Sequence, residues 1–174
     1  MTQPTFLDLP SAPPNHAPEG LNVAILGIPH GVAYPDPGPT AGCAEAPAAI
    51  RARSARLAQF AAHHDFDLDG PMLPPGSAVR LFDAGDVEGS AEDGPHNQQR
   101  AEAAVAELLE SGVVPIALGG DDSIPIPVLR AYGGRGPLWV LHVDAHLDFR
   151  HEVHGEREGY SSPMRRAAEL PEVA

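Results

Sequence analysis

The sequence predicts an α/β fold with a mainly parallel sheet and helices packed on its faces. Short runs of branched apolar residues alternate four times with segments of helical periodicity, and glycine or proline separates most of them. Strands that alternate with helices pair in parallel through right-handed crossovers, so this order favours one continuous sheet. The most informative polar residues directly follow two of the predicted strands, which is where ligands bind in such sheets.

Four apolar runs are predicted as the strands of this sheet. They are residues 21–27 (LNVAILG), 78–84 (AVRLFDA), 113–118 (VVPIAL) and 138–143 (LWVLHV). The first run is almost continuously apolar, as expected of a strand that is buried on both faces. Pro115 interrupts the third run and weakly opposes that prediction, because proline cannot donate to a sheet ladder.

Helices are predicted between the strands from the spacing of apolar residues. The first covers about 47–60 and places Ile50 and Phe60 near one face, which is expected to pack on the sheet while the arginines point elsewhere. The second runs between 97 and 111, where apolar residues recur at helical spacing. A third, short helix is predicted over 123–132, with its prolines in the first turn.

The remaining segments are predicted to be loops. Residues 1–20 form a flexible N-terminal arm, and because they have no basic start and no continuous apolar run, no signal peptide is expected. Residues 21–174 are expected to belong to one domain. The polar segment 63–69 contains two histidines and three aspartates, and we interpret it as a solvated turn in preference to a metal site.

Composition and charge exclude several classes of partner. Lysine and arginine number 11 against 24 acidic residues, and the net charge of -13 would repel nucleic acid and anionic membranes. The same charge favours a cationic substrate or a divalent metal. The chain lacks the roughly 20 consecutive apolar residues that a bilayer crossing requires. Cys43 is the only cysteine, so no intrachain disulfide can form and a cytoplasmic location is expected.

The run from 142 to 148 (HVDAHLD) carries the clearest candidate site. Extended backbone would turn Asp144, His146 and Asp148 to one side, where two carboxylates and an imidazole could hold a divalent cation. Mixed oxygen and nitrogen ligands suit manganese, zinc, iron or nickel, and no thiolate is near that would indicate structural zinc. The alternative is a set of exposed polar loop residues. His142 lies deeper in the strand and is predicted to support the site without binding metal.

Two further carboxylates are predicted at the same edge of the sheet. Asp121 and Asp122 follow Gly119 and Gly120 at the end of the third strand. Aspartate caps helices well, and a helix is predicted to begin near Ser123. One of the two carboxylates can therefore cap this helix while the other binds a metal.

At this point the motifs resemble those of a known family. The segments IALGGDDS (116–123) and HVDAHLD (142–148) resemble the paired GGDHS and DAHxD motifs of the ureohydrolase family, which includes arginase and agmatinase. Upstream, LGIPH, PAAIR and FDAGDV resemble the opening segments of that family, so the resemblance extends from about residue 21 to the C-terminus. It implies a three-layer α/β/α, arginase-like fold that is truncated here after about the fourth strand.

The resemblance also implies a metal-dependent reaction. Two divalent ions, usually Mn²⁺, would be bridged by Asp144, with His146 on one ion and Asp148 on the other. A hydroxide between them would attack a small cationic guanidino compound, such as agmatine, and release urea and an amine. The resemblance further implies a homo-oligomer for the full-length protein.

Two departures from the family pattern affect these expectations. Asp122 stands where the family has histidine, and the added carboxylate could shift the metal preference toward Ni²⁺. His154 and Gly155 match the family's proton-transferring His-Gly pair by residue type but come early, whereas counting back from MRRA (164–167) puts Tyr160 in that place. His154 and Tyr160 are therefore both candidates for proton transfer.

The length of the chain leaves other functions open. Members of the family continue into further strands, one with an Asp-x-Asp pair that supplies the remaining metal ligands and another with a substrate-binding glutamate, and no Asp-x-Asp pair follows Asp148 here. A fragment with little activity of its own is therefore expected. The alternatives are a non-catalytic remnant and a metal-binding or interaction module.

Overall fold

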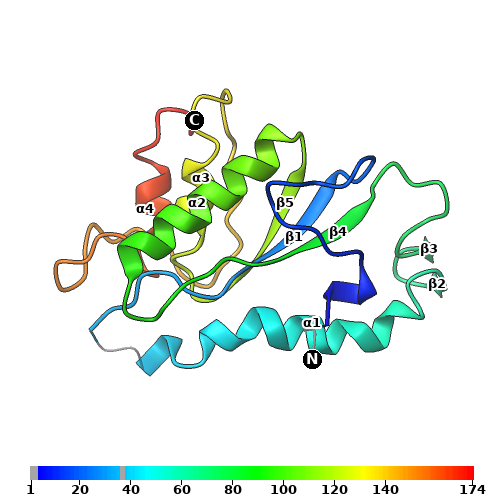
Figure 1. The fold of residues 1–174 in the computed structure, drawn as a ribbon. Coiled ribbons are helices and arrows are strands. Elements are labelled where there is room, and N and C mark those ends of the chain that lie inside the picture. Colours follow the sequence, from blue (N-terminus) through cyan, green and yellow to red (C-terminus); the bar gives the residue numbers. More distant parts are fainter. Residues whose placement is uncertain (1–3, 36–37) are drawn as a thin grey trace.

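The computed structural model describes residues 4–35 and 38–174 and contains a three-stranded parallel sheet (Figure 1). The strands lie in the order β4-β1-β5. Their bounds are Val23–Ile28 for β1, Leu81–Asp86 for β4 and Val114–Gly119 for β5. In register, Val23 of β1 aligns with Leu81 and with Val114. The first three predicted strands and the parallel sheet are thus confirmed.

The central position of β1 follows from its composition. Its sequence VAILGI has no polar side chain, and every residue after Val23 is buried, as a strand covered on both faces requires. β5 is an edge strand, and this position explains how it tolerates Pro115. The N–H of Val114 donates to Asn22 of the neighbouring chain segment, so the nitrogen of Pro115 faces the open side, where no ladder bond is lost.

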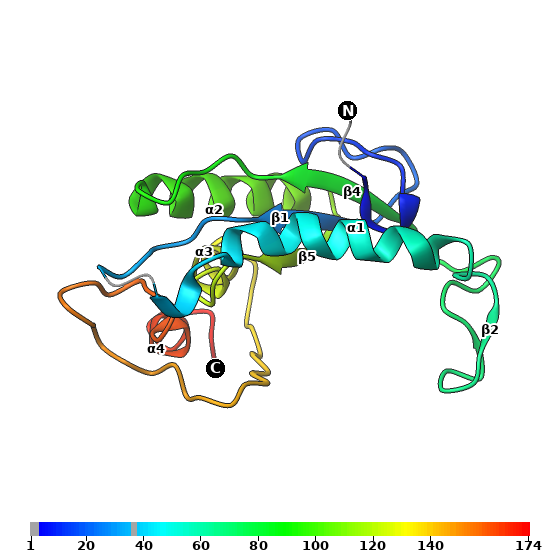
Figure 2. The same cartoon turned by 90° about the horizontal axis from the view of Figure 1, so that it is seen from below.

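Helices cover both faces of the sheet and complete three layers (Figures 1 and 2). Helix α1 (Ala46–Ala58) lies on one face, and α2 (Gly94–Glu110) and α3 (Pro125–Arg130) lie on the other. The short α4 (Pro163–Ala167) packs against α3. The core between the sheet and α2 includes Leu26, Phe82, Val105 and Leu108. This arrangement confirms the predicted α/β/α architecture. No helix among the described residues has the length and apolarity needed to span a membrane.

The predicted sheet-facing side of α1 is wrong. Ile50 is 39% exposed and Phe60 is 50% exposed, whereas Arg51 is buried at 3%. The reason is Asp83, a carboxylate of β4 that is 1% exposed and receives hydrogen bonds from the Arg51 guanidinium. Because a buried carboxylate needs a partner charge, α1 turns this arginine, and not its apolar residues, toward the sheet.

Residues 4–20 pack against the domain, so the prediction of a flexible arm is wrong for them. They contain the 3₁₀ turn η1 (Phe6–Asp8), and the backbone N–H of Phe6 donates to Asp83 at 2.7 Å. The N–H of Leu7 donates to Ser54 of α1 at 2.8 Å. Residues 1–3 of the predicted arm lie outside the described residues.

Short elements occupy the remaining loops. Two 3₁₀ turns, η2 (Gly38–Thr40) and η3 (Cys43–Glu45), precede α1, and residues 36–37 of this predicted loop lie outside the described residues. β2 (His64–Asp65) and β3 (Gly70–Pro71) form a small hairpin. Phe66 in its turn is 92% exposed, which agrees with the solvated turn predicted there.

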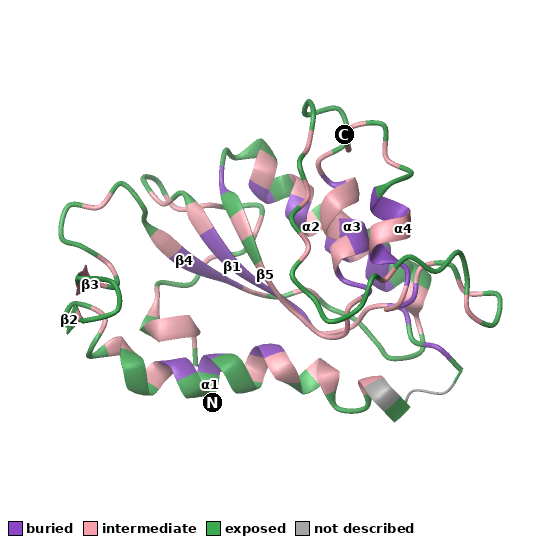
Figure 3. Cartoon of the chain, turned by 180° about the vertical axis from the view of Figure 1, so that it is seen from behind, coloured by how far each residue is buried: buried purple, intermediate pink, exposed green. Residues whose placement is uncertain are grey.

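The predicted fourth strand, residues 138–143, does not join the sheet. Among the described residues, its ladder contact is one isolated bridge between Leu138 and Val173. The backbone still alternates, but Trp139, Leu141 and Val143 are each at least 87% exposed. The segment runs apart from the open edge of β5 (Figure 3), and a cavity of about 500 Å³ is lined by residues of both. An extended segment becomes a strand only where a neighbour accepts its hydrogen bonds.

Candidate metal centre

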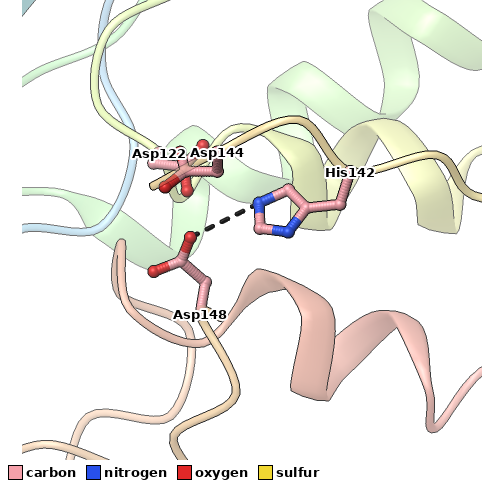
Figure 4. A group of neighbouring side chains, drawn as sticks. All are labelled: Asp122, His142, Asp144 and Asp148. Carbon is pink, nitrogen blue, oxygen red and sulfur yellow. Dashed lines mark ion pairs between the residues drawn. The ribbon is translucent and has the colours of Figure 1, made fainter. Parts of the chain in front are cut away.

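Four side chains from two loops converge beyond the C-terminal end of β5 (Figure 4). Asp122, His142, Asp144 and Asp148 each offer a ligand atom, and these atoms all lie within 4.8 Å of one another. We call these four residues the acidic cluster. Three carboxylates and one imidazole are the donor types that divalent transition metals bind in mixed oxygen and nitrogen sites.

The two aspartates in the loop after β5 have different roles. Asp121 accepts hydrogen bonds from the N–H and the hydroxyl of Ser123, so it caps the turn that leads into α3. Asp122 is left to face the acidic cluster. Gly120 allows this turn, because a Cβ there would lie 2.4 Å from the carbonyl oxygen of Pro29. The resemblance placed Asp122 at the position of a family histidine, and the structure brings Asp122, and not Asp121, into the acidic cluster.

Asp148 contributes a carboxylate that is nearly enclosed. Its side chain is 8% exposed, and its Oδ2 lies 3.5 Å from Nε2 of His142 without making a hydrogen bond. Its backbone is in the left-handed region at φ 44, a conformation that aspartate tolerates better than most residues. The first amides of α4, from Met164 and Arg165, donate to the carbonyl of Asp148 and hold it there. A buried oxygen without a donor is a favourable place for a cation.

The backbone around Asp144 explains why His146 lies outside the acidic cluster. Oδ1 of Asp144 accepts a hydrogen bond from the N–H of His146 at 2.7 Å, which bends residues 144–146 into a turn. This hydrogen bond holds the pKa of Asp144 below its usual range. The predicted extended backbone is therefore wrong here, and His146 is 81% exposed with Nδ1 3.2 Å from Asp144. His142, which the sequence predicted to support the site without binding metal, lies in the acidic cluster in place of His146.

The charge of the acidic cluster is unbalanced. Burial, and then the neighbouring carboxylate of Asp148, raise the pKa of Asp122 to about 6. A like charge and loss of solvent both disfavour the ionised form, so Asp122 keeps its proton to a higher pH than an ordinary aspartate. A divalent cation would remove the same repulsion and would also satisfy the free oxygen of Asp148. The residues present therefore fit a divalent ion.

A cavity of about 620 Å³ opens beside the acidic cluster. It is lined by Asp122, Asp144, His146, Leu147, Asp148, Phe149, Arg150, Tyr160 and Ser161. His146 thus remains at the wall of the cavity although it lies outside the acidic cluster. Its predicted role as a metal ligand stays a prediction.

The structure separates the two candidates for proton transfer. Tyr160 lines the cavity, and its ring packs against Tyr34 with the centroids 4.5 Å apart. His154 lies in an exposed turn at φ 52 and is not part of the cavity wall. No pattern in the sequence predicted that Tyr34 would pack against Tyr160. Arg150 lies only two residues after Asp148, so its place in the cavity wall could have been predicted.

The sequence and the fold both resemble proteins of one family. A model of the arginase family matches residues 21–174. The mitochondrial agmatinase of Gallus gallus is 31% identical over 153 residues, covering 87% of this chain and 42% of that protein. The guanidinopropionase of Pseudomonas aeruginosa is 30% identical over 169 residues, covering 95% of this chain and 48% of that protein.

The fold of a solved structure agrees with this match. Proclavaminate amidino hydrolase from Streptomyces clavuligerus superposes with a TM-score of 0.75 at 29% sequence identity. The match covers 97% of this chain and 53% of that one. The chain therefore spans about half the length of the curated relatives it matches.

Proposed function

Because the chain belongs to the arginase family, we propose that it carries part of the active site of a metal-dependent hydrolase that cleaves a C–N bond in a linear amidine or guanidino compound. The products would be urea and an amine. The relatives named agmatinase and guanidinopropionase support a small substrate with a cationic guanidino group. The observation that carries the proposal is the convergence of four ligand atoms within 4.8 Å in the acidic cluster.

We propose that this cluster holds two divalent ions, Mn²⁺ or Ni²⁺. Asp122, Asp144 and Asp148 would supply oxygen ligands, and His142 would supply nitrogen, with His146 available at the cavity wall. Asp122 adds an anionic oxygen where the family motif has histidine. Four donors cannot fill two coordination shells of manganese or nickel, so the remaining ligands would come from water or from polypeptide outside this chain.

Such ions, when bound, lower the pKa of a coordinated water and polarise the substrate. The residues of this chain have other tasks in the reaction. The three carboxylates would hold the ions beside the cavity in which the guanidino group would bind. Tyr160 borders the cavity and could hold or deliver a proton through its phenol, so we propose it over His154 for proton transfer.

Metal binding and urea release test the proposal in two stages. Titration with Mn²⁺ and Ni²⁺ is expected to show binding that Asp122→Asn and Asp148→Asn weaken. Urea would then be measured from agmatine, 4-guanidinobutyrate and guanidine, with this chain alone and with an added polypeptide that corresponds to the part of the relatives that this chain does not cover. Metal binding without urea under both conditions would favour the second candidate, a metal-binding or interaction module. The half-length match to the relatives gives that candidate its support.

We also propose a cytoplasmic location and a set of excluded partners. The single cysteine, Cys43, fits a reducing cytoplasm. The net charge of -13 opposes nucleic acid and membrane partners. We further propose that the full-length protein is a homo-oligomer, as the resemblance to the family implies, and size measurement in solution would test this.

A further inference from the structure

We infer that Arg150 recognises the far end of the substrate and selects a compound that ends in a carboxylate, a guanidino acid. This inference rests on the proposed function, since it concerns the substrate of the same cavity. Arg150 lines the cavity of about 620 Å³ together with the three carboxylates of the acidic cluster. Among the residues that line it, Arg150 is the one arginine or lysine.

The charge of Arg150 is unshared, unlike that of the arginines around it. Arg130 pairs with Glu158, and three others pair with Glu169: Arg157, Arg165 and Arg166. The Arg150 side chain forms no hydrogen bond or ion pair with any residue that the structure describes. In particular, it does not pair with the aspartates that share its cavity. Its guanidinium is therefore free to meet a ligand.

The backbone of Arg150 is fixed although its side chain is free. Its N–H donates to the carbonyl of Ser161 at 3.1 Å. The hydroxyl of Ser161 lies 2.7 Å from that of Tyr34, in the loop that follows β1. Gly159 fits closely against Tyr34, because a Cβ there would lie 2.0 Å from the ring. These contacts hold Arg150 at the wall of the cavity, which reduces the ordering that a bound ligand would require.

Arg150 would act on the end of the ligand that lies away from the acidic cluster. The proposed function places the guanidino group at the acidic cluster, so Arg150 in the cavity wall can contact the other end of the compound. A planar guanidinium such as that of Arg150 binds a carboxylate through two parallel hydrogen bonds, and it repels an ammonium group. Agmatine and 4-guanidinobutyrate share the guanidino group, but agmatine ends in an ammonium and 4-guanidinobutyrate ends in a carboxylate. The cavity is thus suited to the second compound.

Binding measurements on the chain loaded with Mn²⁺, or with Ni²⁺, test this inference without relying on turnover. Calorimetric titration is expected to show 4-guanidinobutyrate bound about tenfold or more tightly than agmatine, as one charge-assisted hydrogen-bonded pair would give. Arg150→Ala should remove the preference, and Arg150→Lys should retain part of it. Arg53→Ala is the matched control, because it removes the same charge from an exposed position on α1.

The outcomes separate this inference from the proposed function. An Arg150-dependent preference for 4-guanidinobutyrate without any urea release would support the inference and count against hydrolysis. Urea released from agmatine at least as readily as from 4-guanidinobutyrate would support hydrolysis and overturn the inference. Equal binding of the two compounds, no binding of 4-guanidinobutyrate, or equal losses in Arg150→Ala and Arg53→Ala would also overturn it.

Discussion

Oδ2 of Asp148 lies 3.5 Å from Nε2 of His142, and this buried oxygen has no hydrogen-bond donor among the described residues. Two residues that stand six apart in the sequence thus face each other across an incomplete site. The same motif places Asp144 beside them, and the loop after β5 adds Asp122. The relationship matters because an enclosed carboxylate oxygen without a donor destabilises the metal-free chain and favours the bound cation.

Asp148→Asn should weaken metal binding and leave the fold intact. The amide keeps the shape of the carboxylate but removes the charge and half of its strong acceptor capacity. We expect the dissociation constant for Mn²⁺ to rise at least about tenfold, the lower end of what disturbed metal sites lose. Calorimetric titration measures this change. Asp67→Asn, in the exposed β2–β3 turn, is the control and should bind Mn²⁺ like the wild type.

The metal-free chain should lose stability as the pH rises through about 6. The pKa of Asp122 is raised in the folded chain, to about 6, from an ordinary value of 3.8. A carboxyl with a raised pKa in the folded chain contributes to the free energy of unfolding at pH values below the pKa that it has in the unfolded chain. This contribution is lost as the pH rises and the carboxyl ionises in the folded chain. Urea denaturation between pH 4 and pH 7 tests the sign, with chelator present. A pH dependence that is the same in Asp122→Asn would contradict the assignment.

Metal binding should follow the opposite trend with pH. A cation binds the ionised carboxylate, so it must displace the proton that Asp122 holds below about pH 6. The affinity for Mn²⁺ should therefore increase between pH 5 and pH 7, and binding at the lower pH should release a proton. Titration in two buffers of different ionisation enthalpy counts the protons. No proton release at pH 5 would place the metal elsewhere.

Arg51→Met should strongly destabilise the fold. Arg51 pairs with Asp83 and Asp86, and it donates to the carbonyl of Gly85. Burial alone would raise the pKa of Asp83, but hydrogen bonds from Arg51 and from backbone amides hold it below its usual range. Loss of the guanidinium leaves a buried carboxylate unpaired, which costs about 3–5 kcal/mol. Urea denaturation of Arg51→Met and of the exposed control Arg53→Ala should differ by this amount.

Trp139 should report on the unpaired segment before α4. It is the only tryptophan and is 87% exposed. Its fluorescence should resemble that of free tryptophan and should be quenched readily by iodide. Emission typical of a buried indole would show that this segment is covered in solution.

The sequence predicts the sheet better than it predicts the contacts of individual side chains. β1, β4 and β5 follow from apolar runs because burial on both faces leaves little alternative. The face of α1 could not be predicted, because Arg51 is turned inward by Asp83, a residue 32 positions away. The apolar run at 138–143 has the pattern of a strand, but pairing also requires a neighbouring strand, and no local pattern supplies one.

The site shows the same limit. The motifs correctly brought Asp122, Asp144 and Asp148 to one edge of the sheet. They did not predict which histidine accompanies them, because the hydrogen bond from the His146 amide to Asp144 replaces extended backbone with a turn. The position of His146 depends on the Asp144 carboxylate, which accepts a hydrogen bond from the nearby backbone N–H of His146. The alternation of side chains along a strand does not predict such a local hydrogen bond.

The central claim is that Asp122, His142, Asp144 and Asp148 together bind a divalent cation. Paramagnetic Mn²⁺, added in small amounts to isotope-labelled chain, broadens the NMR signals of the residues nearest to it. The account predicts selective loss of the signals from these four residues and from Asp121, reversed by chelator and weakened in Asp148→Asn. Signals that persist there, or that broaden first at other acidic segments such as residues 65–69, would contradict it.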